Sequence, residues 1–456
     1  MLKGGVKHHL NTLSVTFQYY FTYYNTFSDS FIFYKNNMNT DEPFDVAIIG
    51  GGIVGCATVF HLTNHGYRCI LLEKNRHLIA GASAGNSGML HTGFDAPLGS
   101  LELRCIQESQ KQIYEILNKL ELPCNRIGAT MIAWDQIQLS KLPAIIHNSH
   151  QAHVQEVQQL SISELYQREP NLAVGATGAI HIPGEAIIDP WLTPVSFAEH
   201  ARARGAKICT QTVANNFDFN ELNGIWTISS DRGQIKSHLV INCGGLYGDI
   251  VDRLVGYNSF RIKPRKGQYL IFDKMAQGLV SSSLLPVPTE TTKGVIVFKS
   301  MYGNTIIGPT AEETDDRCAT PIIDQNTTSR LKDHGQKTVP SLMSHKVIRM
   351  YTGVRPATEN KDYQIIPRVD RNWLTVGGIR STGLSACIGI ADYSYSLVKE
   401  NYGLEPSGVP WNSLDKIHYT FSNRGTAEFQ NGVEHLITHP LTLTGLVNQC
   451  IPNSNL

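Results

Sequence analysis

Paired cysteines are missing from this chain. Its nine cysteines are scattered, odd in number and never spaced as C-x-x-C. This distribution argues against a disulfide framework and against a zinc or iron–sulfur ligand set. We therefore expect no bound metal, and cysteines that pack as small buried side chains in a reducing compartment. The predicted location is the cytoplasm, with the mitochondrion as the alternative.

Net charge and long apolar runs are also missing. Lysine plus arginine and aspartate plus glutamate both number 39, which gives no support to nucleic acid as a partner. No apolar run reaches the ~20 residues that a transmembrane segment needs. Residues 1–42 hold no arginine and fit neither a presequence nor a signal peptide. They are predicted to be a disordered extension, whose many aromatic side chains leave a peripheral membrane contact open.

A glycine loop between two apolar segments is the clearest motif that is present. Residues 44–49 predict a buried strand, and the loop after it opens a helix that reaches about residue 64. Gly50 permits the tight turn, Gly52 lets the backbone approach a pyrophosphate, and Gly55 lets the helix pack on the strand. The helix N-terminus faces the phosphates. The next strand ends in Glu73, which can bind ribose hydroxyls and would repel a 2′-phosphate, so the motif predicts a βαβ dinucleotide site.

A stretch of small residues after Glu73 distinguishes between dinucleotides. Residues 80–91 read AGASAGNSGMLH and can run against a cofactor, offering backbone N–H groups and short hydroxyls. An enzyme that binds a nicotinamide has no need of this second loop, so we predict FAD. His91 is the only residue of the stretch that could attach covalently to a flavin. We expect non-covalent FAD.

Two further strand–glycine–helix units lie far along the chain. Residues 237–242 lead into Gly244, and residues 373–376 lead to a helix that begins at Gly383. Another helix is predicted to start at Asp189, with the aspartate as its N-cap. Between these units, shorter alternating strands predict an antiparallel sheet (268–272, 294–298 and 305–308).

Units so far apart in sequence imply one sheet that the chain revisits. The predicted fold class is α/β, with an FAD-binding Rossmann-like βαβ domain and a second α+β substrate domain built on a largely antiparallel sheet. The expected boundaries are 43–125, 186–258 and 362–403 for the FAD-binding domain, and 126–185 and 259–361 for the substrate domain. Residues 404–456, which show no strong pattern, are expected to form a C-terminal tail.

The motifs together resemble the D-amino-acid-oxidase superfamily of FAD enzymes, within it most of all glycerol-3-phosphate oxidases/dehydrogenases and L-2-hydroxyglutarate oxidases. The likeness covers residues from about 44 to 400. The stretches that carry it are DVAIIGGGIVG (45–55), LLEK (71–74), NSGMLHTGFD (86–95), REPNL (168–172), INCGGLYGD (241–249), KPRKGQY (263–269), VPTETTKGVIV (287–297), GPTAEE (308–313), GVRPATENKDY (353–363) and GGIRSTGLSACIGIA (377–391).

The resemblance implies roles for individual residues in holding the cofactor. The flavin would lie against the segment 86–90 and the start of the last helix, the adenine beside Val213, and the diphosphate beside Gly244. The full predicted set is Gly50, Gly52, Ile53, Val54, Gly55, Glu73, Lys74, Ser83, Asn86, Ser87, Gly88, Met89, Leu90, Val213, Gly244, Gly383, Leu384 and Ser385. One departure is the missing cysteine-rich module of some dehydrogenases, since only Cys450 follows Cys387.

Three residues are candidates for the chemistry of oxidising a small anionic 2-hydroxy compound. His91 can take the hydroxyl proton near neutral pH, or it merely packs beneath the flavin. Arg355 can hold a phosphate or carboxylate in a bidentate fork, or it forms a structural ion pair with Glu359 or Asp362. Lys293 is a second cation for the substrate anion, or a solvated lysine in a hairpin.

The identity of the substrate stays open at this point. Glycerol 3-phosphate is the first expectation, L-2-hydroxyglutarate the alternative, and an amine or amino acid a weaker third. The electron acceptor would be oxygen or a quinone. A different class of function, a non-catalytic or RNA-modifying flavin-binding protein, is disfavoured by the balanced charge.

Overall fold

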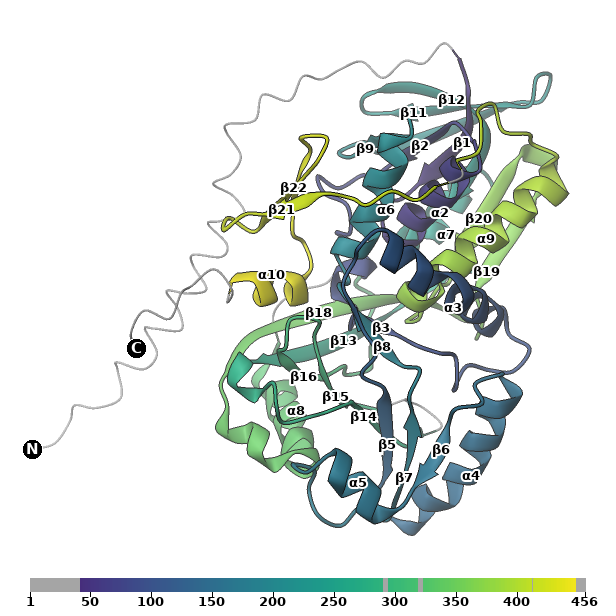
Figure 1. Ribbon diagram of the computed structural model, residues 1–456. Coiled ribbons are helices and arrows are strands. Elements are labelled where there is room, and N and C mark those ends of the chain that lie inside the picture. Colours follow the sequence, from purple (N-terminus) through teal and green to yellow (C-terminus); the bar gives the residue numbers. More distant parts are fainter. Residues whose placement is uncertain (1–41, 290–293, 319–322, 412, 448–456) are drawn as a thin grey trace, which may run out of the picture. The chain divides into compact units, whose positions relative to one another are not determined.

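The described residues belong to one compact unit of mixed α/β structure. The computed structural model describes residues 42–289, 294–318, 323–411 and 413–447 (Figure 1). The predicted N-terminal extension, with its aromatic residues, and Lys293 therefore lie outside the described residues, Glu42 excepted. None of the described helices is long and apolar enough to cross a membrane.

A largely parallel sheet is built from the strand–glycine–helix units. Its parallel strands follow the order β20 (Trp373–Gly377), β12 (Gly233–Asn242), β1 (Phe44–Ile49), β2 (Cys69–Leu72) and β9 (Lys207–Cys209). Antiparallel strands extend it: β11 (Ile225–Ser230), β10 (Ala214–Asn220) and β19 (Gln364–Arg368). β1 and β2 are buried along their whole length, which explains why they read as apolar runs apart from Asp45, whose buried carboxylate accepts from the N–H of Arg68.

Helices pack together beside this sheet and fix the glycine loops. α2 (Ile53–Asn64) contacts both α6 (Leu192–Ala203) and α9 (Gly383–Tyr402), and α3 (Leu101–Lys119) packs on α9 (Figure 1). α7 (Gly248–Leu254) follows β12 and contacts β10, β12 and β20. α6 begins two residues later than the predicted Asp189–Pro190 start. The Asp189 carboxylate nevertheless caps it, accepting hydrogen bonds from the N–H groups of Trp191 and Leu192.

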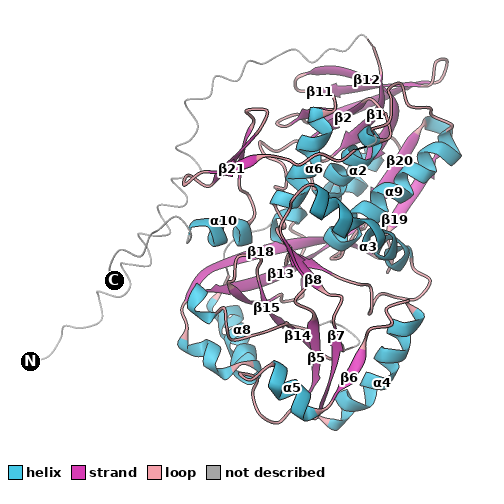
Figure 2. Ribbon diagram, viewed as in Figure 1, coloured by secondary structure: helices cyan, strands magenta, loops and turns pink. Residues whose placement is uncertain are grey.

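A second, larger sheet is almost wholly antiparallel, with only β14 and β5 running parallel. The helices α4 (Gln136–Gln151), α5 (Ile162–Arg168) and α8 (Gln325–Thr338) belong to the same region (Figure 2). The order of its strands is β17 (Glu312–Glu313), β13 (Ile262–Phe272), β16 (Thr305–Gly308), β15 (Ile296–Lys299), β14 (Ser283–Pro286), β5 (Ala129–Ala133), β7 (Gly178–Ile182) and β6 (Gln158–Leu160), with β18 (Val347–Thr358) paired to β13. The predicted fold class, a βαβ sheet with a largely antiparallel second sheet, is confirmed.

Short elements connect the two sheets. β3 (Met89–Leu90), β8 (Ala186–Ile188) and β4 (Cys124–Asn125) form a small sheet in the order β3-β8-β4. The 3₁₀ helix η1 (Ala82–Gly85) contacts β18 of the second sheet. The segment that follows β2, which includes η1 and β3, thus lies against β18 of the second sheet.

Sequence patterns did not reveal the elements near the C-terminus. After residue 404 the structure forms β21 (Tyr419–Phe421), β22 (Thr426–Phe429), β23 (Glu434–Leu436) and α10 (Pro440–Val447), drawn in yellow in Figure 1. The strands are only three or four residues long, too short to show a period. The apolar side chains of Phe429 and Ile437 pack in the main hydrophobic core. Polar contacts add to this packing, because His435 and Asn431 both bond the buried carboxylate of Glu199, at 2.8 and 2.7 Å.

Candidate active site

The dinucleotide loop has a geometry that only glycine can supply. Gly50 adopts a φ of +108°, and a Cβ on it would lie 2.4 Å from the carbonyl oxygen of Cys243. A Cβ on Gly55 would lie 1.9 Å from the carbonyl oxygen of Gly50. Gly244 follows Cys243, so the turns after β1 and β12 touch. Adjacent parallel strands therefore end in two glycine turns that pack closely against each other.

Glu73 lies at the mouth of this loop. Its side chain follows β2 and is buried, with Oε2 accepting a hydrogen bond of 2.7 Å from the N–H of Gly51. Oε1 accepts from the backbone and the side chain of Asn75, at 2.7 and 2.6 Å. These contacts fix an acidic group beside the phosphate-binding turn, where ribose hydroxyls can donate to it.

The first amide of α2 is held by a hydroxyl oxygen. Ser83 Oγ accepts from the N–H of Ile53 at 3.0 Å, where the oxygen of a phosphate could take its place. Val54 lies next to Ile53 on α2. The N–H of Gly244 donates to Asn242 Oδ1 at 3.0 Å.

Two predicted cofactor residues have other contacts. The ammonium of Lys74 lies 3.3 Å from the centroid of the Tyr247 ring, a cation–π contact, and burial lowers the pKa of Lys74 while Glu73 opposes this effect. The side chain of Val213 is exposed, and its N–H donates to Asp231 at 2.9 Å. The cofactor roles of both residues stay predictions.

The predicted flavin-lining segment 86–90 is fixed by the last helix. Asn86 donates to the carbonyl of Ser83 and accepts from the N–H of Gly88, both at 2.8 Å, and Ser87 lies between them. Ser385 Oγ accepts from the N–H of His91 at 2.8 Å and donates to the carbonyl of Met89 at 3.3 Å. Ser385, near the N-terminus of α9, therefore joins this helix to Met89 and His91. The implied approach of Gly383, Leu384 and Ser385 to the flavin stays a prediction.

His91 is paired with a buried carboxylate that the sequence did not identify. His91 Nδ1 lies 2.7 Å from Oε2 of Glu185, a side chain with no solvent exposure. The other oxygen of Glu185 accepts from the N–H and hydroxyl of Thr92, at 2.7 and 2.9 Å. A histidine that donates from Nδ1 to a carboxylate presents Nε2 as its basic nitrogen. Because 94 positions separate the pair, no local pattern could reveal it.

Arg355 lies on the face of β18 that is turned toward the flavin-lining segment. Tyr351, Gly353 and Arg355 alternate along one face, opposite Tyr269, Gly267 and Arg265 of β13. The Tyr351 hydroxyl donates to the carbonyl of Asn86 at 3.2 Å. A Cβ on Gly267 would lie 2.6 Å from Nη2 of Arg355, so this glycine leaves room for the guanidinium.

The acids considered as ion-pair partners of Arg355 are engaged elsewhere. Asp362 accepts from the N–H groups of Leu101 and Glu102, at 2.7 and 2.9 Å. Glu359 accepts from the N–H of Arg261 through both oxygens, at 3.2 and 3.1 Å. The guanidinium instead lies beside Tyr269, where it acts to lower the pKa of a phenol that burial raises.

The residues fit FAD. In the predicted arrangement, the diphosphate would lie at the glycine turns and the N-terminus of α2, the ribose at Glu73, and the flavin at the segment that bonds α9. A Cβ on Gly50, Gly51, Gly52 or Gly55 would meet protein atoms, so the first loop cannot accept a side chain at these positions without moving.

The comparisons with known proteins agree with this geometry. Residues 45–396 match the family model described as FAD dependent oxidoreductase (DAO), and the chain belongs to that family. It is an FAD-dependent oxidoreductase. It is 30% identical over 361 residues to the glycerol 3-phosphate dehydrogenase of Caloramator mitchellensis, covering 78% of this chain and 74% of the relative.

Other relatives include a solved structure. The chain is 28% identical over 383 residues to the glycerol 3-phosphate oxidase of Mycoplasma pneumoniae, covering 81% of this chain and all of the relative. The structure of L-alpha-glycerophosphate oxidase from Mycoplasma pneumoniae with FAD bound superposes with a TM-score of 0.73, covering 78% of this chain and 95% of that one. The mitochondrial L-2-hydroxyglutarate dehydrogenase of Caenorhabditis briggsae is 26% identical over 365 residues, covering 76% and 84%.

Proposed function

We propose that this enzyme oxidises a small anionic 2-hydroxy compound, glycerol 3-phosphate first, at the carbon that bears the hydroxyl. The observation that carries the proposal is the His91–Glu185 pair at the end of the flavin-lining segment. Two relatives named for glycerol 3-phosphate oxidation or dehydrogenation support the choice of substrate. The flavin supplies the hydride acceptor when FAD is bound.

His91 acts as the base in this proposal. Its Nε2 takes the proton of the substrate hydroxyl as the carbonyl of the product forms, and Nδ1 keeps its hydrogen bond to Glu185. The buried carboxylate holds the ring in one orientation and stabilises the imidazolium that results. A base positioned in this way is typically worth about 10²–10⁴ in rate.

Arg355 binds the anionic group of the substrate. Its guanidinium lies on the same strand face as Tyr351, whose hydroxyl contacts the flavin-lining segment. A planar fork binds a phosphate or a carboxylate through two parallel hydrogen bonds. Lys293 is a second cation proposed for the same anion.

L-2-hydroxyglutarate is the alternative substrate, favoured by the relatives that bear its name. Arg355 suits its carboxylate as well as a phosphate, and an amine or amino acid is a third candidate. We also propose oxygen or a quinone as electron acceptor and a cytoplasmic location, with the mitochondrion as the alternative. The free state of the eight described cysteines supports a reducing compartment.

Anaerobic mixing of the yellow enzyme with a panel of these compounds tests the proposal. Rapid bleaching by one compound identifies the substrate, and readmission of oxygen or a quinone identifies the acceptor. His91→Asn is expected to slow the bleaching by one to three orders of magnitude, which overlaps the ~10²–10⁴ range for loss of a general base. An unchanged rate would remove His91 from the mechanism.

A further inference from the structure

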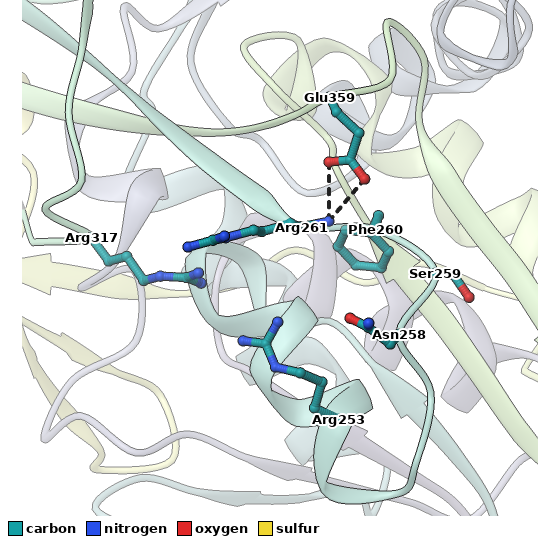
Figure 3. Close-up of a pocket in the computed structure, with 7 residues that line it drawn as sticks. All are labelled: Arg253, Asn258, Ser259, Phe260, Arg261, Arg317 and Glu359. Carbon is teal, nitrogen blue, oxygen red and sulfur yellow. Dashed lines mark hydrogen bonds between the residues drawn. The ribbon is translucent and has the colours of Figure 1, made fainter.

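A cavity lined by three arginines lies apart from the proposed active site. It has a volume of about 570 Å³ and is formed by Arg253 of α7, by Asn258, Ser259, Phe260 and Arg261 before β13, by Arg317 after β17, and by Glu359 after β18 (Figure 3). The guanidinium groups of Arg253, Arg261 and Arg317 point toward a shared space.

One of these arginines is fixed rigidly. Arg317 donates to both carboxylate oxygens of the buried Asp249, at 2.6 and 2.9 Å, and also to the carbonyl of Leu246. Although burial acts to raise the pKa of Asp249, the hydrogen bonds from Arg317 and from the N–H of Ile262 lower it overall. The carboxylate therefore stays ionised, and it holds Arg317 in place at the wall of the cavity.

The acids near the cavity do not balance its positive charge. Asp249 already holds Arg317, and Arg253 approaches it only to 3.5 Å with a side chain that is 42% exposed. Glu359 uses both oxygens for the main-chain N–H of Arg261. In Figure 3 the Arg261 guanidinium extends away from Glu359 and toward Arg317. Among the described residues that line the cavity, three arginines face Glu359, and with Asp249 behind Arg317 included this set carries one excess positive charge.

We propose that this cavity binds a small oxyanion that carries two or more negative charges, with a phosphate group as the best fit. Guanidinium groups match the geometry of phosphate oxygens and bind them through paired hydrogen bonds. A ligand would also relieve the repulsion among the three cations. The cavity is within the ~300–1,000 Å³ range of small-molecule sites, but its lining is polar, which favours an anion over an apolar ligand.

The site is distinct from the anion-binding role proposed for Arg355. Arg265 of β13 faces Arg355 of β18 in the sheet, and Arg261 precedes Arg265 by four residues. At about 3.3 Å per residue, the two positions are about 13 Å apart along the strand. The anion would bridge α7, which follows the Gly244 turn, and the ends of β13 and β18. Binding would therefore fix the position of the Gly244 turn relative to β18, the strand that carries Arg355.

Titration of the FAD-loaded enzyme with inorganic phosphate tests this proposal. The experiment uses Arg355→Ala as the parent, so that the proposed substrate site does not contribute, and sodium chloride of equal ionic strength controls for screening. Calorimetry gives the affinity and thermal unfolding gives the stabilisation. Arg261→Ser and Arg253→Ser are then introduced separately, and Arg330→Ser serves as the charge-matched control. The Arg330 side chain is 56% exposed and makes a single long ion pair of 3.7 Å with Glu312.

The parent and the Arg330→Ser variant are expected to bind one phosphate with equal affinity. Arg261→Ser or Arg253→Ser should weaken that affinity at least tenfold while the flavin absorbance shows that FAD is retained. Absence of phosphate binding in the Arg355→Ala parent would overturn the proposal. So would binding that is unaffected in both cavity variants, or stabilisation that sodium chloride reproduces. None of these results depends on which substrate the enzyme oxidises.

Discussion

The backbones of Gly85 and Gly353 cross so closely that neither residue has space for a side chain. A Cβ on Gly85 would lie 2.2 Å from the Cα of Gly353, and a Cβ on Gly353 would lie 2.2 Å from the carbonyl oxygen of Gly85. Gly85 ends η1, just before the flavin-lining segment, and Gly353 lies on β18 two residues before Arg355. The crossing therefore sets the distance between the flavin-lining segment and the proposed anion-binding arginine.

Gly353→Ala should force these two backbones apart. An added methyl group in a packed site typically costs about 1–3 kcal/mol of folding free energy. We expect a lower midpoint of thermal unfolding and faster release of FAD, measured by fluorescence of the freed flavin. Gly81→Ala is the matched control, because a Cβ there meets nothing within 4 Å. An equal rate of FAD release from both variants would show that the close contact between Gly85 and Gly353 is not needed to retain FAD.

Glu185→Gln should slow flavin reduction without releasing FAD. The amide keeps the shape of the side chain but loses the charge that stabilises the imidazolium of His91. We expect the rate of reduction at saturating substrate to fall by about one to three orders of magnitude. Stopped-flow absorbance measures this rate. Glu156→Gln, an exposed acid of the same region, should leave it unchanged. A wild-type rate in Glu185→Gln would argue against the pair as a catalytic unit.

Arg355→Ala should weaken substrate binding while FAD stays bound. Loss of a charge-assisted hydrogen-bonding partner costs about 1.5–3 kcal/mol, so KM should rise by roughly one to two orders of magnitude. Arg355→Lys should recover only part of this loss, because an ammonium cannot form the bidentate fork. Steady-state kinetics separates KM from kcat. Arg371→Ala, at an exposed turn, is the control. Kinetics like those of the wild type would remove Arg355 from the site.

Buried histidines should make the fold sensitive to acid. Burial lowers the pKa of His439 to about 3, and the pKa values of His61 and His200 are also lowered to about 3. Below pH 6.5, the ordinary pKa of histidine, the unfolded chain binds protons at these rings and the native state does not. The free energy of unfolding is therefore highest above pH 6.5 and falls as the pH drops toward 3.

Thermal unfolding followed from pH 7 to pH 4 measures this dependence. The midpoint should decrease across the range, and His439→Asn should flatten the decrease. His147→Asn, at an exposed histidine, should leave the slope of the wild type. A midpoint that does not change with pH would contradict the burial of these neutral rings.

Elements whose structure depends on neighbouring residues in the sequence could be predicted from the sequence. The glycine loop, the buried strands β1 and β2 and the helix that starts at Gly383 follow from spacing and residue type. The strand predicted at residues 305–308 agrees with β16 (Thr305–Gly308), whose residues are all buried. Ser385 of this helix bonds the N–H of His91. The implied approach of the helix to the flavin itself stays a prediction.

Features that depend on long-range packing could not be predicted. Glu185 is a single acid in a turn, and only the folded chain shows that it meets His91. His439 lies far beyond the family match, yet its ring centroid is 6.0 Å from that of Tyr351 beside the site. The short strands and α10 that bring it there pack on the main core through side chains such as Phe429, and Thr442 also bonds Asp189. Contacts between residues so far apart in sequence leave no local period.

The most direct test is an anaerobic comparison of glycerol 3-phosphate with glycerol. In the proposed mechanism both offer the same hydroxyl to His91, but only glycerol 3-phosphate carries the anion proposed to bind Arg355. The absorbance of the oxidised flavin, at about 450 nm as for flavins in general, should bleach rapidly with glycerol 3-phosphate and hardly at all with glycerol. If both compounds leave the enzyme yellow, and an amino acid bleaches it instead, the proposed substrate class is wrong.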